Sequence, residues 1–127
     1  LVFMPGQMSF EEYFRLEGCS IDEMAVRFFL GLAPGGLHAE QLVVPSSIDL
    51  KNRKGPSTII GCQLCAGVAA TEAVKILLGR GEVMAAPHGY QFDPFSGRLH
   101  HSFLEKGNDE PEQIRRIEEM KRNIGAQ

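Results

Sequence analysis

Two cysteines, Cys62 and Cys65, are separated by two residues, a spacing that is typical of thiol chemistry. A thiol in the first turns of a helix can have its pKa lowered by nearby backbone amides, which favours the nucleophilic thiolate. The neighbouring residues here are mostly apolar, and an apolar environment acts in the opposite direction. We therefore expect Cys62 and Cys65 to be buried packing residues, and we keep a catalytic redox or sulfur-handling role and metal binding as alternatives.

Metal binding at these cysteines requires more ligands than the sequence places near them. A tetrahedral structural zinc site normally uses four ligands, and the only other cysteine is the isolated Cys19. No pair of histidines stands at a zinc-finger spacing from the cysteines. The sequence therefore predicts no metal site, although four histidines are present: His38, His88, His100 and His101.

A second candidate site is a predicted turn, Pro94-Phe95-Ser96-Gly97, which Asp93 and Arg98 flank. Proline presets one backbone dihedral of such a turn and glycine can adopt a positive one. Asp93 and Arg98 can pair across the turn, and a surface pair of this kind is worth under about 1 kcal/mol. We expect a structural role for both and keep contact with the tail of a bound substrate as the alternative.

The longest element that must position these residues is a helix predicted over 57–78. Ser57 or Thr58 can cap its start and Gly79 can end it. The helix is apolar nearly all round, which is typical of burial in a core or a membrane, and its few polar residues favour the core. The sequence therefore predicts a buried central helix.

The remaining elements are shorter. Cap residues Ser9 and Ser20 predict helices over 10–17 and from 20 to Leu32, the second with a core stripe that includes Met24, Phe28 and Phe29. We expect a short strand at 42–44 and a solvated basic loop at 49–55. A hairpin should pair 90–93 with 98–104 around the turn and place His100 and His101 on opposite faces. A last helix is predicted over 109–125.

Composition limits the partners. The chain has 127 residues, 43% of them hydrophobic, and a net charge of −3, so it suits one domain or subdomain and neither nucleic acid nor a membrane is expected as a partner. Three cysteines do not make a disulfide framework, which favours a reducing, cytoplasmic compartment. Since the first residue is Leu1, we expect the chain to begin within a longer protein.

Two blocks of residues resemble ThiF/MoeB-type adenylyltransferases, which are related to ubiquitin-activating enzymes. Gly55-Pro56, Ile59-Ile60-Gly61 and the run from Ala66 to Gly79 are similar to the helix after that family's crossover loop, and Phe92-Asp93 with Ser96-Gly97 to its next hairpin. The resemblance implies an α/β fold, namely the C-terminal portion of a Rossmann-like ThiF-type fold with a buried central helix, a β-hairpin and flanking helices. Residues 1–54 would be a helical and crossover region, 55–104 the core helix plus hairpin, and 109–125 the C-terminal helix.

The resemblance also implies a function. Members of this family use ATP and magnesium to adenylate the C-terminus of a ubiquitin-like or sulfur-carrier protein, and a homo-oligomer is expected. Their nucleotide binds a Gly-rich loop between a strand and a helix, whereas the glycines at 31, 35 and 36 and Gly79-Arg80-Gly81 follow helices. We therefore expect no cofactor-binding residue in this chain, and ATP chemistry to need a further half.

Two alternatives remain open. One is a non-catalytic protein-interaction module of the same fold, and the other is a thiol-dependent enzyme that uses Cys62 and Cys65. The family's usual acceptor cysteine lies in the crossover loop, and this chain has no cysteine between Leu37 and Gly55.

Overall fold

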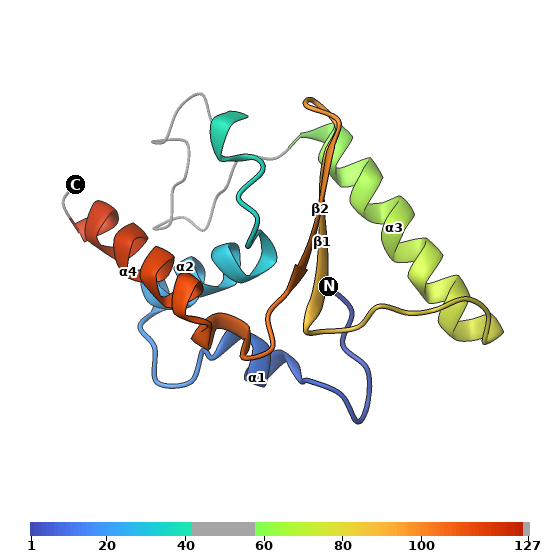
Figure 1. The fold of residues 1–127 in the computed structure, drawn as a ribbon, viewed down its shortest axis with the longest axis horizontal. Coiled ribbons are helices and arrows are strands. Elements are labelled where there is room, and N and C mark those ends of the chain that lie inside the picture. Colours follow the sequence, from blue (N-terminus) through green and yellow to red (C-terminus); the bar gives the residue numbers. More distant parts are fainter. Residues whose placement is uncertain (42–57, 126–127) are drawn as a thin grey trace.

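The computed structural model describes residues 1–41 and 58–125. The described elements are α1 (Phe10–Phe14), α2 (Ile21–Leu32), the 3-10 turn η1 (Ala39–Gln41), α3 (Ile59–Leu78), β1 (His88–Asp93), β2 (Arg98–Phe103), the 3-10 turn η3 (Gly107–Asp109) and α4 (Pro111–Gly125). The fold is thus mixed α/β, and the sheet that these residues form is one two-stranded antiparallel hairpin. In Figure 1 the hairpin stands between α3 on one side and α1, α2 and α4 on the other. The predicted strand at 42–44 and basic loop at 49–55 lie outside the described residues.

The N-terminal helices begin at the cap residues that the sequence predicts. Ser9 accepts a hydrogen bond from the Glu12 amide, and the Glu12 carboxylate accepts one from the Ser9 amide at 2.8 Å, which is a complete capping box. The Ser20 side chain likewise accepts from the backbone of Glu23 at the start of α2. Helix α1 ends earlier than predicted, at Phe14, because Arg15 adopts a left-handed conformation with φ of 53°.

The core lies between α1 and the segment that leads into the hairpin. Tyr13, Phe14 and Ala86 are buried there, and four partly buried apolar side chains surround them: Phe3, Met8, Leu16 and Leu104. Burial raises the pKa of Tyr13 to about 12, so its hydroxyl stays protonated and available as a donor at neutral pH.

The predicted core stripe on α2 is wrong. Met24, Phe28 and Phe29 are 37–43% exposed, and the buried residues of α2 are Val26 and Gly31. Helix α1 covers this stripe only in part: Phe14 contacts Phe28 with ring centroids 5.1 Å apart, and it comes closest at Gly31, where a Cβ would lie 2.7 Å from its Cε1. Because α1 has only five residues, part of the apolar stripe is left in solvent.

Buried polar side chains hold the end of α2. Tyr13 Oη donates to the carbonyl of Gly31 at 3.0 Å, Asn108 Nδ2 to that of Arg27 at 2.8 Å, and Gln113 Nε2 to that of Leu30 at 3.1 Å. The last four carbonyls of a helix have no partner within the helix, so Tyr13 and Gln113 supply partners for Gly31 and Leu30, and Asn108 adds a second hydrogen bond at Arg27. They come from α1, η3 and α4, and together they join these elements to α2.

The hairpin has the predicted strands and turn. Its register pairs Asp93 with Arg98 and His88 with Phe103 across the strands. Gln91, Asp93 and Ser102 face inward and are buried, and the Gly35 amide after α2 donates to Gln91 Oε1 at 2.6 Å. The outward face carries two histidines and four aromatic or apolar residues: His88, Tyr90, Phe92, Leu99, His101 and Phe103. His88 is half-buried and the others are exposed. The polar face of the hairpin is therefore the packed one.

Helix α3 corrects the prediction of a buried central helix. It has the predicted extent, from the Thr58 cap to a left-handed Gly79 with φ of 59°, but none of its residues is buried. Its apolar side chains are exposed by as much as 82%, at Leu77. The physical reason is that none of the described helices and strands packs closely enough against α3 to bury any of its residues. Sequence reasoning recognised an apolar helix correctly and wrongly assigned its cover to this chain.

Candidate functional site

The two cysteines lie on α3, one turn apart near its start. Cys62 is in the second turn, where its backbone amide donates to the carbonyl of Thr58 at 3.0 Å, and Cys65 follows three residues later. Residues three apart in a helix are neighbours on its surface, so the two side chains share one side of α3. Both cysteines are free and exposed, which corrects the prediction that they are buried packing residues.

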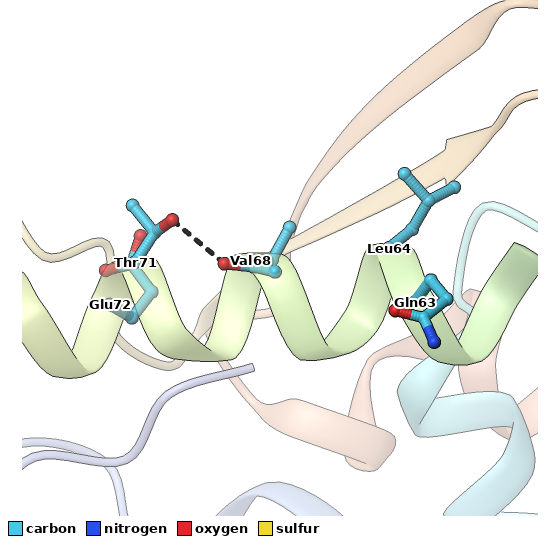
Figure 2. A pocket seen from close by; sticks show the side chains of 6 residues that line it. Gln63, Leu64, Val68, Thr71 and Glu72 are labelled. Carbon is cyan, nitrogen blue, oxygen red and sulfur yellow. Dashed lines mark hydrogen bonds between the residues drawn. The ribbon is translucent and has the colours of Figure 1, made fainter.

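A shallow surface hollow lies on α3 beside the cysteines. Figure 2 shows its side chains along the helix, which are those of Gln63, Leu64, Val68, Thr71 and Glu72, with Gly67 completing the lining. The hydroxyl of Thr71 donates to the carbonyl of Gly67 at 2.9 Å, so its hydrogen-bond partner lies within the helix. The lining offers apolar surface and few polar groups, which suits packing against protein better than catalysis.

The charged residues of α3 pair with each other. Lys75 Nζ lies 2.7 Å from Glu72 Oε1 and also donates to the carbonyl of Glu82 at 3.3 Å. Glu72 and Lys75 are the two half-buried residues of an otherwise exposed helix. The two charged side chains of α3 therefore pair with each other, and the exposed surface of the helix is mainly apolar.

The turn residues Asp93 and Arg98 are brought together, as predicted, and joined through Ser96. The Asp93 carboxylate accepts hydrogen bonds from the Ser96 hydroxyl and, at 3.0 Å, from the Phe95 amide. Arg98 Nε donates to Ser96 Oγ at 3.0 Å. The pKa of Asp93 lies below its ordinary value of 3.8, and the hydrogen bond from Ser96 is the main cause. The nearby His38 lowers this pKa further. This network explains both residues as parts of the turn.

The turn makes a pH prediction. Because the folded pKa of Asp93 lies below the unfolded value near 3.8, its stabilisation is complete above that pH and is lost as the pH falls through the folded pKa. Asp93→Asn is therefore expected to lower the free energy of unfolding at pH 7. This loss should become smaller as the pH falls below about 4. Urea unfolding at pH 7, 4 and 3 measures this. A loss of stability that is the same at all three pH values would contradict this role of the Asp93 carboxylate. The control is Glu105→Gln, on an exposed residue just after β2.

Sequence reasoning missed the inward face of the hairpin and one histidine pair. Gln91 is buried and binds the Gly35 backbone, while its Nε2 has no hydrogen-bond partner. His100 and His101 do lie on opposite faces, as predicted, with His100 packed inward against Gly35. On the outward face His101 meets His88. Alternation along a strand predicts which face each residue lies on. Which residues meet across the two strands depends on their register, and alternation alone does not predict it.

Neither candidate site has the donor set of a metal or phosphate site. Among residues 1–41 and 58–125, no group of three or more His, Cys, Asp or Glu side chains is placed to hold a metal ion. Gly79 and Gly81 follow the C-terminal end of α3, and Gly35 and Gly36 follow that of α2. That end of a helix carries the negative pole of its dipole, so it repels phosphate.

Comparison with known proteins leaves these features to be interpreted on physical grounds. No protein-family model matches the chain, and neither a curated protein nor a solved structure does.

Proposed function

We propose that this chain is the C-terminal part of a ThiF/MoeB-type adenylyltransferase that activates the C-terminus of a ubiquitin-like or sulfur-carrier protein. In this proposal ATP and magnesium bind a separate Rossmann-like half, and α3 is the surface that packs against it. The order of elements supports it, since a capped apolar helix ending at Gly79 is followed by a hairpin that turns at 94–97. The sequence resemblance covers these same elements.

The observation that carries the proposal is the uncovered surface of α3. Eight of its large apolar side chains are exposed: Ile59, Ile60, Leu64, Val68, Val74, Ile76, Leu77 and Leu78. Fully burying one such side chain is worth about 1.5–3 kcal/mol, so covering them would stabilise an assembly by on the order of 10 kcal/mol. A helix that is apolar all round is ordinarily buried. The chain is therefore proposed to work as one layer of a larger α/β unit.

A membrane is the competing cover for α3. The helix is long and apolar enough to cross one, by length and composition alone, which is weak support because core helices pass the same test. Glu72 and Lys75 lie within the helix, and a charged residue near the centre of a bilayer costs roughly 2.5–3.5 kcal/mol. Protein is therefore the cover that we propose.

The cysteines give a direct test of what covers α3. Cys62 and Cys65 are exposed in this chain, so a thiol reagent is expected to label both quickly. In the complete product of the gene that encodes this chain, both are expected to be protected at least about tenfold, because a layer of protein covers the helix. The half-buried Cys19, on the loop before α2, is the internal reference and should keep its rate. Protection that appears only with lipid vesicles would favour a membrane, and two thiols that stay reactive in the complete product would favour a thiol-dependent enzyme.

Activity is tested separately by pyrophosphate exchange. The complete gene product with magnesium-ATP and a carrier protein is expected to exchange labelled pyrophosphate into ATP, whereas the 127-residue chain alone is not. The reason is that adenylation needs positioned donors and cations around the phosphates, and the two glycine pairs, Gly35-Gly36 and Gly79 with Gly81, follow the C-terminal ends of α2 and α3. Tight, salt-insensitive ATP binding by this chain alone would overturn the proposal.

A further inference from the structure

We propose that His88 and His101 form a two-histidine site for a divalent transition-metal ion, on the outward face of the hairpin. This inference does not depend on the proposed function. It follows from the distance between two ring nitrogens, from the rings that flank them and from their accessibility.

The two histidines come from neighbouring strands. His88 is the first residue of β1 and lies opposite Phe103, while His101 lies opposite Tyr90, so the histidines are diagonal neighbours on one face. His88 Nδ1 is 3.0 Å from His101 Nε2. The ring centroids are 5.2 Å apart and the ring planes differ by 16°, so the two nitrogens are the nearest edges of the rings and face each other.

This nitrogen separation is the one that a shared metal requires. Two imidazole nitrogens bound at about 2.05 Å stand roughly 2.9 Å apart at a right angle and roughly 3.3 Å apart at the tetrahedral angle. The observed 3.0 Å lies between these values. Each ring turns by roughly 35–45°, so that the two lone pairs converge on one point beside the N–N line. The proton that one of the two facing nitrogens carries in the metal-free pair moves through water to the other nitrogen of the same ring, which frees both facing nitrogens to coordinate the ion.

Aromatic neighbours flank the two histidine rings. Tyr90 stacks on His101 with centroids 4.8 Å apart, and Phe103 packs against His88 at 4.7 Å. These contacts limit the rotamers of both histidines, so less entropy is lost when a metal binds. The opposite face of the hairpin contacts Gly35 just after α2, so the pair projects away from α2. His101 is exposed and His88 half-buried, which leaves the remaining coordination positions open to water.

The donor set selects the class of metal. Imidazole nitrogen with water suits Cu²⁺, Ni²⁺ and Zn²⁺, and Mg²⁺ and Ca²⁺ prefer oxygen. Among these ions the general order of affinity places Cu²⁺ first. Two ligands on one rigid hairpin bind as a chelate, which raises affinity by about a hundredfold or more over a single histidine.

Nickel titration of the untagged 127-residue chain tests the site, with Cys62→Ser and Cys65→Ser as background so that thiols do not compete. One Ni²⁺ per chain is expected by calorimetry, and His88→Gln and His101→Gln should each weaken binding about a hundredfold. The control is His100→Gln, next in sequence but on the opposite face, which should stay within about threefold. Because the two changed side chains project outward, circular dichroism should report an unchanged fold.

A second measurement uses the background chain without further substitution. Saturating Ni²⁺ is expected to raise its thermal midpoint, since the ion links β1 to β2 in the folded state alone, and Mg²⁺ is expected not to. Electron paramagnetic resonance of the Cu²⁺ complex should show two coordinated nitrogens, reduced to one in either variant. Binding within about threefold of the parent in His88→Gln or His101→Gln, an equal loss in His100→Gln, or no thermal shift with Ni²⁺ would each overturn the proposal.

Discussion

Gly107→Ala is expected to destabilise the body formed by α1, α2 and α4 by on the order of 2–5 kcal/mol, enough to unfold it in a marginally stable chain. Gly107 has φ of +58°, and a Cβ there would collide with the carbonyl oxygen of Tyr13 and lie 2.7 Å from its Cα. A left-handed alanine costs about 1–2 kcal/mol, and overpacking adds about 1–3 kcal/mol. The obstacle is the backbone of the buried residue Tyr13, so it cannot move aside as a flexible side chain does.

Urea unfolding followed by circular dichroism at 222 nm measures this loss, and Gly18→Ala is the matched control. Gly18 also has a positive φ, of +73°, but a Cβ there would meet nothing within 4 Å. The control therefore isolates the backbone strain, and a loss of about 1–2 kcal/mol is expected for it. Equal losses for the two variants would show that η3 is not held against Tyr13 in the way described.

Asn108→Ala is expected to cost about 2–5 kcal/mol, the second large effect. Asn108 is fully buried, and its Nδ2 donates to the carbonyls of Phe14 at 3.0 Å and Arg27 at 2.8 Å. Alanine leaves the buried Phe14 carbonyl without this donor, which costs about 1–3 kcal/mol, and removes the second hydrogen bond of the Arg27 carbonyl, which is worth about 0.5–1.5 kcal/mol. The amide joins the end of α1 to α2, so its loss weakens the contact between two helices rather than one turn.

Asn108→Asp separates hydrogen bonding from packing. The aspartate has nearly the same shape, but its ionised carboxylate cannot donate and would stand against two carbonyl oxygens. Burial would raise the pKa of the new carboxyl above its unfolded value, so the variant should be more stable at pH 4 than at pH 8 relative to the parent. Asn123→Ala, on an exposed residue of α4, should change stability by no more than about 0.5 kcal/mol. An Asn108→Asp variant as stable as the parent at pH 8 would refute the role of the two donors.

Local signals in the sequence were sufficient for much of the secondary structure. Ser9, Ser20 and Thr58 each begin the helix predicted from them, and Gly79 ends α3, because a cap depends on residues within one turn. The hairpin and its turn at 94–97 follow from alternation and from proline and glycine. The joining of Asp93 to Arg98 was also accessible, because residues that flank a tight turn must face each other.

Burial could not be predicted in this way, because it depends on what the rest of the molecule places nearby. The apolar pattern of α3 predicts that the helix needs a cover and does not say which chain provides it, so Cys62 and Cys65 were assigned to a core and are exposed. On α2 the same pattern suggested Met24, Phe28 and Phe29 as core. The short helix α1 covers Phe28 only in part and leaves Met24 and Phe29 exposed.

The sequence by itself determined, to within about two residues, where the helices begin and where the hairpin turns, since caps, turns and alternation act over a few residues. Only the tertiary structure decided that the polar face of the hairpin packs inward and its aromatic face, with His88 and His101, stays open. It also decided that Asn108 and Gln113 would satisfy carbonyls of α2 more than 80 residues earlier in the chain. Contacts between distant segments depend on the sum of many packing and hydrogen-bond energies, and no short stretch of residues contains that sum.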